Sequence, residues 1–176
     1  MLTVRTVAVD DPGELSEWAD AAHPTAFLRG GDGIVGIGTR VQLEGHSLAQ
    51  LTEQWQRLAS SAVVHDEVDL PGTGLVAFGS IAFSDTSTAP SIFIVPSVVV
   101  GRRNGVSFLT TIDGGLSAAP TPVGSAPAAT LVPGAMSELA YVTAVRAATE
   151  AIGAGRARKV VLARDLVAGI PATADR

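Results

Sequence analysis

The stretch Ser91–Ile112, SIFIVPSVVVGRRNGVSFLTTI, contains two runs of apolar and β-branched residues on either side of Asn104-Gly105. Such runs favour strands, and an Asn-Gly pair between them supplies the two left-handed residues of a tight hairpin turn. The stretch therefore predicts two antiparallel strands, Ser91–Gly101 and Val106–Ile112. It is the clearest sign in the chain of an antiparallel sheet.

Further strands and two helices are predicted before this hairpin. Apolar patterns predict strands at Leu2–Val9, Thr25–Arg29, Ile34–Leu43 and Leu75–Phe83. A helix is predicted over Ser47–Ser60, because Ser47 followed by Gln50 has the form of a capping box. A shorter helix is expected over Glu14–Ala21, after Asp11-Pro12.

A Pro, Ala and Gly-rich stretch follows the hairpin and predicts a surface connection over 114–134. After it, Ser137–Ile152 has a helical apolar stripe, with Gly153 or Gly155 available to end the helix. A strand is predicted over Lys159–Val167. Antiparallel strands followed by a helix–strand unit indicate an α+β protein. Three regions are therefore expected: 1–113, 114–134 and 135–176.

Composition excludes several classes of function. The net charge of −5, with basic clusters only at Arg102-Arg103 and Arg156–Arg164, argues against nucleic-acid binding. The chain has no cysteine, which excludes disulfides and thiolate metal sites. Its most apolar stretch, Ile92–Val100, is too short to span a bilayer. We therefore expect a cytoplasmic protein with no membrane partner.

Other motifs favour structural interpretations. Gly31–Gly36 matches G-x-G-x-x-G, but the β-type residues after it favour a turn and strand over a dinucleotide site. The histidines lack metal-ligand spacing, and Asp66, Glu67 and Asp69 are interpreted as solvated loop carboxylates. Arg102-Arg103 is interpreted as a solvated hairpin tip. The sequence therefore predicts no metal ligand and no cofactor-binding residue.

Lys159 is the single lysine among twelve cationic residues. In the predicted strand, alternate side chains share a face, so Lys159 would point the same way as Val161 and Ala163. Burial among apolar side chains disfavours an ammonium, and a neutral lysine can take a proton from water. Lys159 is therefore a candidate general base. The alternative is an edge lysine that discourages strand aggregation.

The block Arg156–Arg164, RARKVVLAR, after a helix ending in Ile152–Gly155, resembles the signature of the chorismate-utilising enzymes, specifically isochorismate synthases. Phe27–Gly30 and Gly79–Asp85 resemble the family's early strands more loosely. The resemblance implies the N-terminal half of the layered α/β/β/α chorismate-binding fold, mostly antiparallel strands with outer helices. It also implies that Lys159 activates the water that attacks C2 of chorismate, while a glutamate acid assists loss of the C4 hydroxyl and Mg²⁺ binds the substrate.

The family's acid and Mg²⁺ ligands follow the lysine strand and have no counterpart in this chain. We therefore expect a chain that is truncated, inactive alone and prone to self-association through apolar surface, and a monomer when complete. The resemblance implies a role in menaquinone or siderophore biosynthesis. Two alternatives stay open: a salicylate synthase of the same family, and a non-catalytic half-length paralogue that binds a partner or a small acid.

Overall fold

The computed structural model describes residues 1–84, 87–115, 121–122, 124 and 128–171, and divides the chain into two compact units, Met1–Gly124 and Ser125–Arg176. Asp85 and parts of the predicted 114–134 connection lie outside the described residues. The first unit contains β1 (Thr3–Val9), a 3₁₀ helix (Leu15–Trp18), β2 (Thr25–Arg29), β3 (Asp32–Ile37), β4 (Val41–Gly45), α1 (Leu48–Ser61), β5 (Val63–Asp66), β6 (Phe78–Ser80), β7 (Ser91–Val95), β8 (Val98–Arg103) and β9 (Val106–Ile112). The second unit contains β10 (Thr130–Pro133), α2 (Glu138–Gly153) and β11 (Leu166–Gly169).

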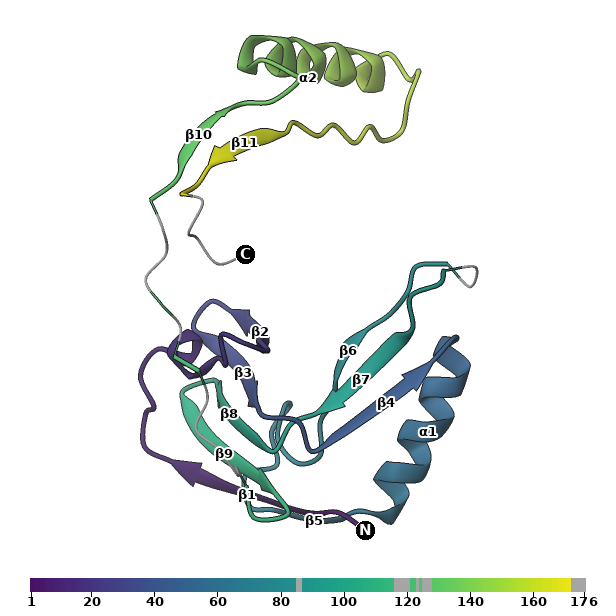
Figure 1. The fold of residues 1–176 in the computed structure, drawn as a ribbon. Helices are drawn as coiled ribbons and strands as arrows, with labels where there is room; N and C mark the ends of the chain where they lie inside the picture. The colour runs from purple at the N-terminus through teal and green to yellow at the C-terminus, as the bar shows by residue number, and fades with distance from the viewer. Residues whose placement is uncertain (85–86, 116–120, 123, 125–127, 172–176) are drawn as a thin grey trace. The chain divides into compact units, whose positions relative to one another are not determined.

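The predicted hairpin is confirmed as β8 and β9, which form the middle of a six-stranded sheet (Figure 1). Asn104 and Gly105 both have positive φ, at 52° and 80°, as the tight turn requires. The strand order is β2-β3-β8-β9-β1-β5. All neighbours are antiparallel except β1 and β5, which run parallel. Together with the helices, this bears out the α+β class.

Two predicted strands are each split between two sheets. Ile34–Leu43 breaks after Ile37, so that β3 lies in the six-stranded sheet and β4 in a three-stranded sheet of order β4-β7-β6. Ser91–Gly101 breaks at Pro96, between β7 and β8. The two breaks are joined, because Arg40 N donates to Val95 O at 2.8 Å and Ser97 N to Ile37 O at 3.1 Å. The paired strands therefore pass from one sheet to the other together.

An ion pair stabilises the region of this bend. The Arg40 guanidinium donates to Asp113 Oδ2 through Nε at 2.8 Å and contacts the same oxygen through Nη2 at 2.7 Å. Asp113 Oδ1 accepts a hydrogen bond from Thr3 N at 2.8 Å. The Thr3 N–H and the Arg40 guanidinium together hold the pKa of Asp113 below its usual value. This carboxylate therefore connects the start of β4, the end of β9 and the start of β1.

The helix α1 begins as its sequence predicts. Ser47 caps it by accepting a hydrogen bond from Gln50 N at 3.3 Å, whereas the Gln50 side chain accepts from His46 N rather than from Ser47. Leu51 is fully buried and packs the helix onto the three-stranded sheet, and Trp55 joins the core around Val4, Val95 and Ile112. Leu48, expected on the same apolar face, is half exposed.

Gly101 on β8 and Phe108 on β9 lie directly opposite each other in the six-stranded sheet. Phe108 is completely buried. Its ring occupies the space that a side chain at position 101 would take, and Ile34 Cγ2 lies 3.0 Å from the same point. A glycine is therefore required at position 101 by close packing, not by backbone conformation.

The substitution Gly101→Ala is expected to lower the free energy of unfolding by about 1–3 kcal/mol, because the new methyl group overlaps the Phe108 ring in a filled core. Urea denaturation followed by fluorescence measures the effect. Gly153→Ala is the matched control, since a methyl group there meets no atom within 4 Å. Equal stabilities of the two variants would contradict this packing.

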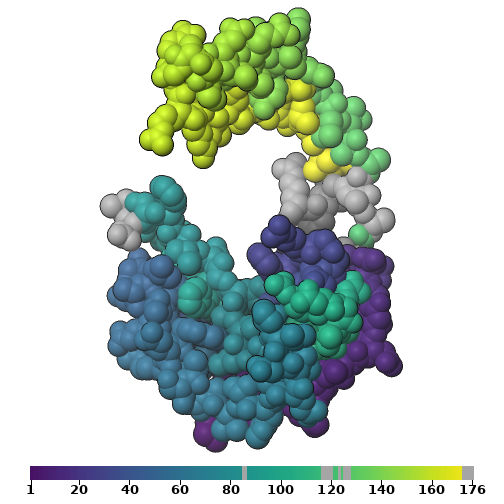
Figure 2. All heavy atoms as spheres, turned by 180° about the vertical axis from the view of Figure 1, so that it is seen from behind, coloured from purple at the N-terminus to yellow at the C-terminus, as the bar shows by residue number. Residues whose placement is uncertain are grey.

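The second unit is a β–α–β arrangement. β10 and β11 pair antiparallel, from Thr130 opposite Gly169 to Pro133 opposite Leu166, and their green and yellow atoms lie against each other in Figure 2. The helix α2 was predicted almost to the residue. Ser137 caps the start of the helix. Gly155, with a φ of 69°, ends it. The N–H of Gly155 donates to Ile152 O, and the N–H of Arg156 donates to Ala151 O.

Candidate active site

Lys159 lies in the segment that joins α2 to β11 in the second unit. The predicted strand Lys159–Val167 is wrong over most of its length, because the strand of the structure begins at Leu166. The Lys159 side chain is exposed. The described residues therefore do not provide the apolar burial that the general-base argument requires.

The strand is shorter than predicted because its partner is short. β10 pairs with β11 only as far as Pro133 opposite Leu166, and one further bond joins Gly134 N to Asp165 O at 3.2 Å. The chain then turns into α2, which Ser137 caps. Upstream of Asp165, the segment has no neighbouring backbone among the described residues with which to form a ladder.

Asp165 fixes the end of this segment. Its carboxylate accepts hydrogen bonds from Ala135 N at 3.2 and 3.1 Å, and the charge-stabilising N–H groups hold the pKa of Asp165 below its usual value. Three arginines, Arg156, Arg158 and Arg164, accompany Lys159 in the segment. The surroundings of the candidate base are therefore mainly cationic and suit an anionic substrate or partner.

Among the described residues, Lys159 has no hydrogen-bond or ion-pair partner. The Nε of Arg164 is buried and has no hydrogen-bond partner. Among the described residues, no other buried side-chain nitrogen or oxygen lacks a partner. Nothing in the sequence distinguishes Arg164 from the other arginines of the block Arg156–Arg164.

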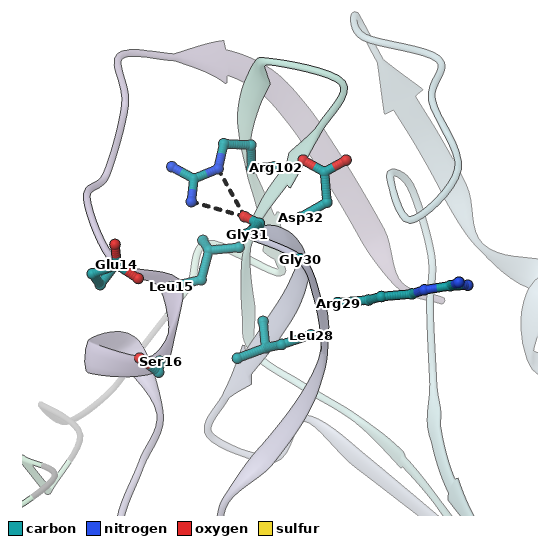
Figure 3. Close-up of a pocket in the computed structure, with 9 residues that line it drawn as sticks. All are labelled: Glu14, Leu15, Ser16, Leu28, Arg29, Gly30, Gly31, Asp32 and Arg102. Carbon is teal, nitrogen blue, oxygen red and sulfur yellow. Dashed lines mark hydrogen bonds between the residues drawn. The ribbon is translucent and has the colours of Figure 1, made fainter.

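A small pocket of about 170 Å³ lies in the first unit, beside the turn between β2 and β3 (Figure 3). Arg102 crosses it and donates from Nε and Nη2 to Gly31 O at 2.9 and 2.8 Å. Nη1 forms an ion pair with Asp11 at 2.7 Å. The interpretation of Arg102 as a solvated tip is therefore wrong. Its guanidinium is committed to protein acceptors and holds the turn in place.

A larger hollow of about 580 Å³ lies between the β2–β3 hairpin and the β6–β7 pair. Its lining is mostly apolar and includes Phe27, Ile34, Phe78 and Ile94. The hydroxyl of Thr25, at its edge, already donates to Gly36 O at 2.8 Å. The lining contains no ionisable side chain. The hollow offers an apolar surface but no group for acid–base chemistry.

The glycine motif forms a turn and a strand, as expected. Gly31 lies in the turn before β3, and Gly36 lies inside β3. A side chain at Gly36 would come within 2.7 Å of the Phe78 ring and 3.1 Å of Pro96. No helix opens at these glycines, so the geometry that a dinucleotide site needs is missing.

Asp66, expected as a solvated loop carboxylate, organises the loop after β5. It accepts hydrogen bonds from Val68 N at 3.0 Å, Asp69 N at 3.1 Å and Thr73 Oγ1 at 2.5 Å. Burial raises the pKa of Asp66, but the hydrogen bonds together lower it by more than burial raises it. The pKa of Asp66 therefore lies below its usual value of 3.8. No pattern in the sequence distinguishes Asp66 from its acidic neighbours.

A carboxyl with a lowered pKa stabilises the folded state above its usual pKa of 3.8, and the contribution is lost as the pH falls through the lower folded value. Asp66→Asn is therefore expected to reduce stability at neutral pH and to weaken the loss of stability below pH 3.8. Urea titrations at neutral pH and at about pH 3 measure both effects. Asp69→Asn is the control, because Asp69 is exposed and asparagine tolerates its φ of 53°. An identical pH response of the two variants would argue against this role.

The described residues contain no group of three or more His, Cys, Asp or Glu side chains that could hold a metal ion. They therefore do not fit the Mg²⁺ site that the resemblance implies. Within the same residues, no helix is both long and apolar enough to cross a bilayer. Compared with models of protein families, with curated proteins and with solved structures, the chain matched none.

Proposed function

We propose that this chain supplies the water-activating lysine of an isochorismate synthase. The observation that carries the proposal is the single lysine of the chain, placed in RARKVVLAR immediately after a helix ended by Gly155. The absence of an ion-pair partner for Lys159 among the described residues supports it, since a base must not be held by a carboxylate. The finer fold assignment, one half of a chorismate-binding core, is part of the same proposal.

In the proposed step, the amine of Lys159 takes a proton from water as the water oxygen bonds to C2 of chorismate. The bond between C4 and its hydroxyl breaks, and an acid protonates the leaving oxygen. A lysine performs the first transfer only when it is neutral, which requires a dry environment. The exposed position of Lys159 therefore requires the bound substrate, or polypeptide that closes over it, to exclude water from the amine.

The acid and the Mg²⁺ ligands are not assigned to residues of this chain. The described residues bring no carboxylates together for either role, so no step is assigned to the ion. The 176-residue chain by itself is therefore expected to leave chorismate unchanged. The proposed activity is that of the protein expressed from its natural gene.

Product analysis tests the proposal. The protein expressed from its natural gene is incubated with chorismate, with and without Mg²⁺, and the products are separated by chromatography. Mg²⁺-dependent isochorismate supports the proposal. Salicylate with pyruvate would replace it with the salicylate synthase alternative, and unchanged chorismate would replace it with the non-catalytic binding alternative.

A further inference from the structure

The segment 158–164, named here the basic segment, leaves its backbone unpaired. It runs as an extended trace between α2 and β11 in Figure 1. No N–H or C=O group of its backbone is hydrogen-bonded to another described residue. Its sequence, RKVVLAR, is rich in β-branched and apolar residues and continues directly into β11. It therefore has the composition of a strand but lacks the neighbour that would make it one.

The apolar side chains of the basic segment are also uncovered. Val161 is 78% exposed, and Val160 and Leu162 are 40% and 37% exposed. Solvated backbone groups beside exposed branched side chains form a template for an added strand. In that geometry Val160 and Leu162 would share one face with the two end residues, Arg158 and Arg164.

Charge determines which strand fits. If a second copy paired antiparallel about Val161, Arg158 of each chain would lie opposite Arg164 of the other, and like charges directly opposite are destabilising. A strand with carboxylates at its two ends would instead place an anion opposite each arginine. Arg164 already has a buried Nε without a partner among the described residues. A carboxylate there would pair with the Arg164 guanidinium through charge-assisted hydrogen bonds.

We propose that the basic segment is a docking site for an extended acidic polypeptide segment, which pairs with 158–164 as an antiparallel strand and so extends β11 at its N-terminal end. Main-chain hydrogen bonds along 158–164 would supply the affinity, and carboxylates opposite Arg158 and Arg164 would supply the specificity. Val160 and Leu162 would pack against apolar residues of the same partner face. The inference does not depend on the proposed activity, because strand addition along 158–164 needs no proton transfer at Lys159 and no chorismate.

The test uses the full chain and two capped synthetic peptides. ETVTVEE places glutamates opposite Arg158, Lys159 and Arg164 in antiparallel register, and KTVTVKK is its charge-reversed match. NMR titration and amide hydrogen exchange measure binding. ETVTVEE is expected to bind at least about tenfold more tightly than KTVTVKK, to protect the alternate amides of 158–164 that face it, and to lose affinity as salt is added.

Two sets of variants locate the binding. Val161→Pro removes one N–H and blocks strand pairing, and the fold is expected to persist because Val161 is exposed and its N–H has no partner. It should lower the affinity for ETVTVEE by at least about tenfold, whereas the control Val161→Thr should bind normally. Combining Arg158→Glu with Arg164→Glu should reverse the preference towards KTVTVKK.

Equal binding of both peptides would overturn the proposal, as would unchanged binding by the Val161→Pro variant. Sedimentation provides a further check. A dimer of the unmodified chain that Val161→Pro dissociates would show that a second copy, rather than an acidic segment, occupies this edge.

Discussion

Replacing Lys159 with alanine is expected to lower the rate of isochorismate formation by about 10²–10⁴-fold, the usual cost of losing a general base. The substitution should change the free energy of unfolding by less than about 0.5 kcal/mol, because the side chain is exposed and has no described partner to lose. The rate is measured in the protein expressed from its natural gene, with Mg²⁺ and saturating chorismate.

Two further substitutions separate a base from a simple cation. Lys159→Arg keeps the positive charge but cannot give up its proton, so it should be as inactive as Lys159→Ala. Lys159→Gln tests whether water addition depends on the amine. Arg146→Ala, which removes an exposed cation from α2, is the control and should keep the normal rate. Near-normal activity of Lys159→Arg would show that Lys159 acts only through its charge.

The substitution Phe108→Ala is expected to have the largest effect on stability, a loss of about 3–5 kcal/mol in the free energy of unfolding. Phe108 is completely buried, and its ring fills the space above Gly101. Removing the ring leaves a cavity that Gly101, which has no side chain, cannot fill. Because domains are stable by only about 5–15 kcal/mol, this loss takes a large part of the total. Urea denaturation measures it.

Phe27→Ala is the matched control, because it removes the same ring from the same sheet. Phe27 lies on the edge strand β2 and is 69% exposed. Its replacement should change stability by no more than about 0.5 kcal/mol. A similar loss in both variants would contradict the burial of Phe108 and the exposure of Phe27.

Local features were predictable because their hydrogen bonds stay within a few residues. The turn at Asn104-Gly105, the cap at Ser47 and the ends of α2 at Ser137 and Gly155 all follow from neighbouring residues. Each depends on a positive φ or on a side chain that accepts a nearby N–H. The sequence alone therefore located the hairpin, the two α-helices and the α+β class.

Features that depend on distant partners were not predictable in the same way. β5, Val63–Asp66, has little apolar pattern, and it is a strand because it lies parallel to β1. Asp66 differs from its acidic neighbours because the loop places the Thr73 hydroxyl where it donates to the Asp66 carboxylate, and this contact spans seven residues of sequence. The sequence around Arg102 predicts a solvated hairpin tip, because its acceptor, Gly31 O, lies 71 residues away in the sequence.

The sequence by itself determined the turn at Asn104-Gly105, the positions of the two α-helices, and that Lys159 is the single lysine of the chain. Only the tertiary structure decided which sheet each strand joins, that the paired strands cross between sheets near Gly38 and Pro96, and that Lys159 lies outside a strand. The physical reason is that a helix or turn satisfies its own backbone. A strand exists only where another segment, distant in the sequence, supplies the hydrogen bonds.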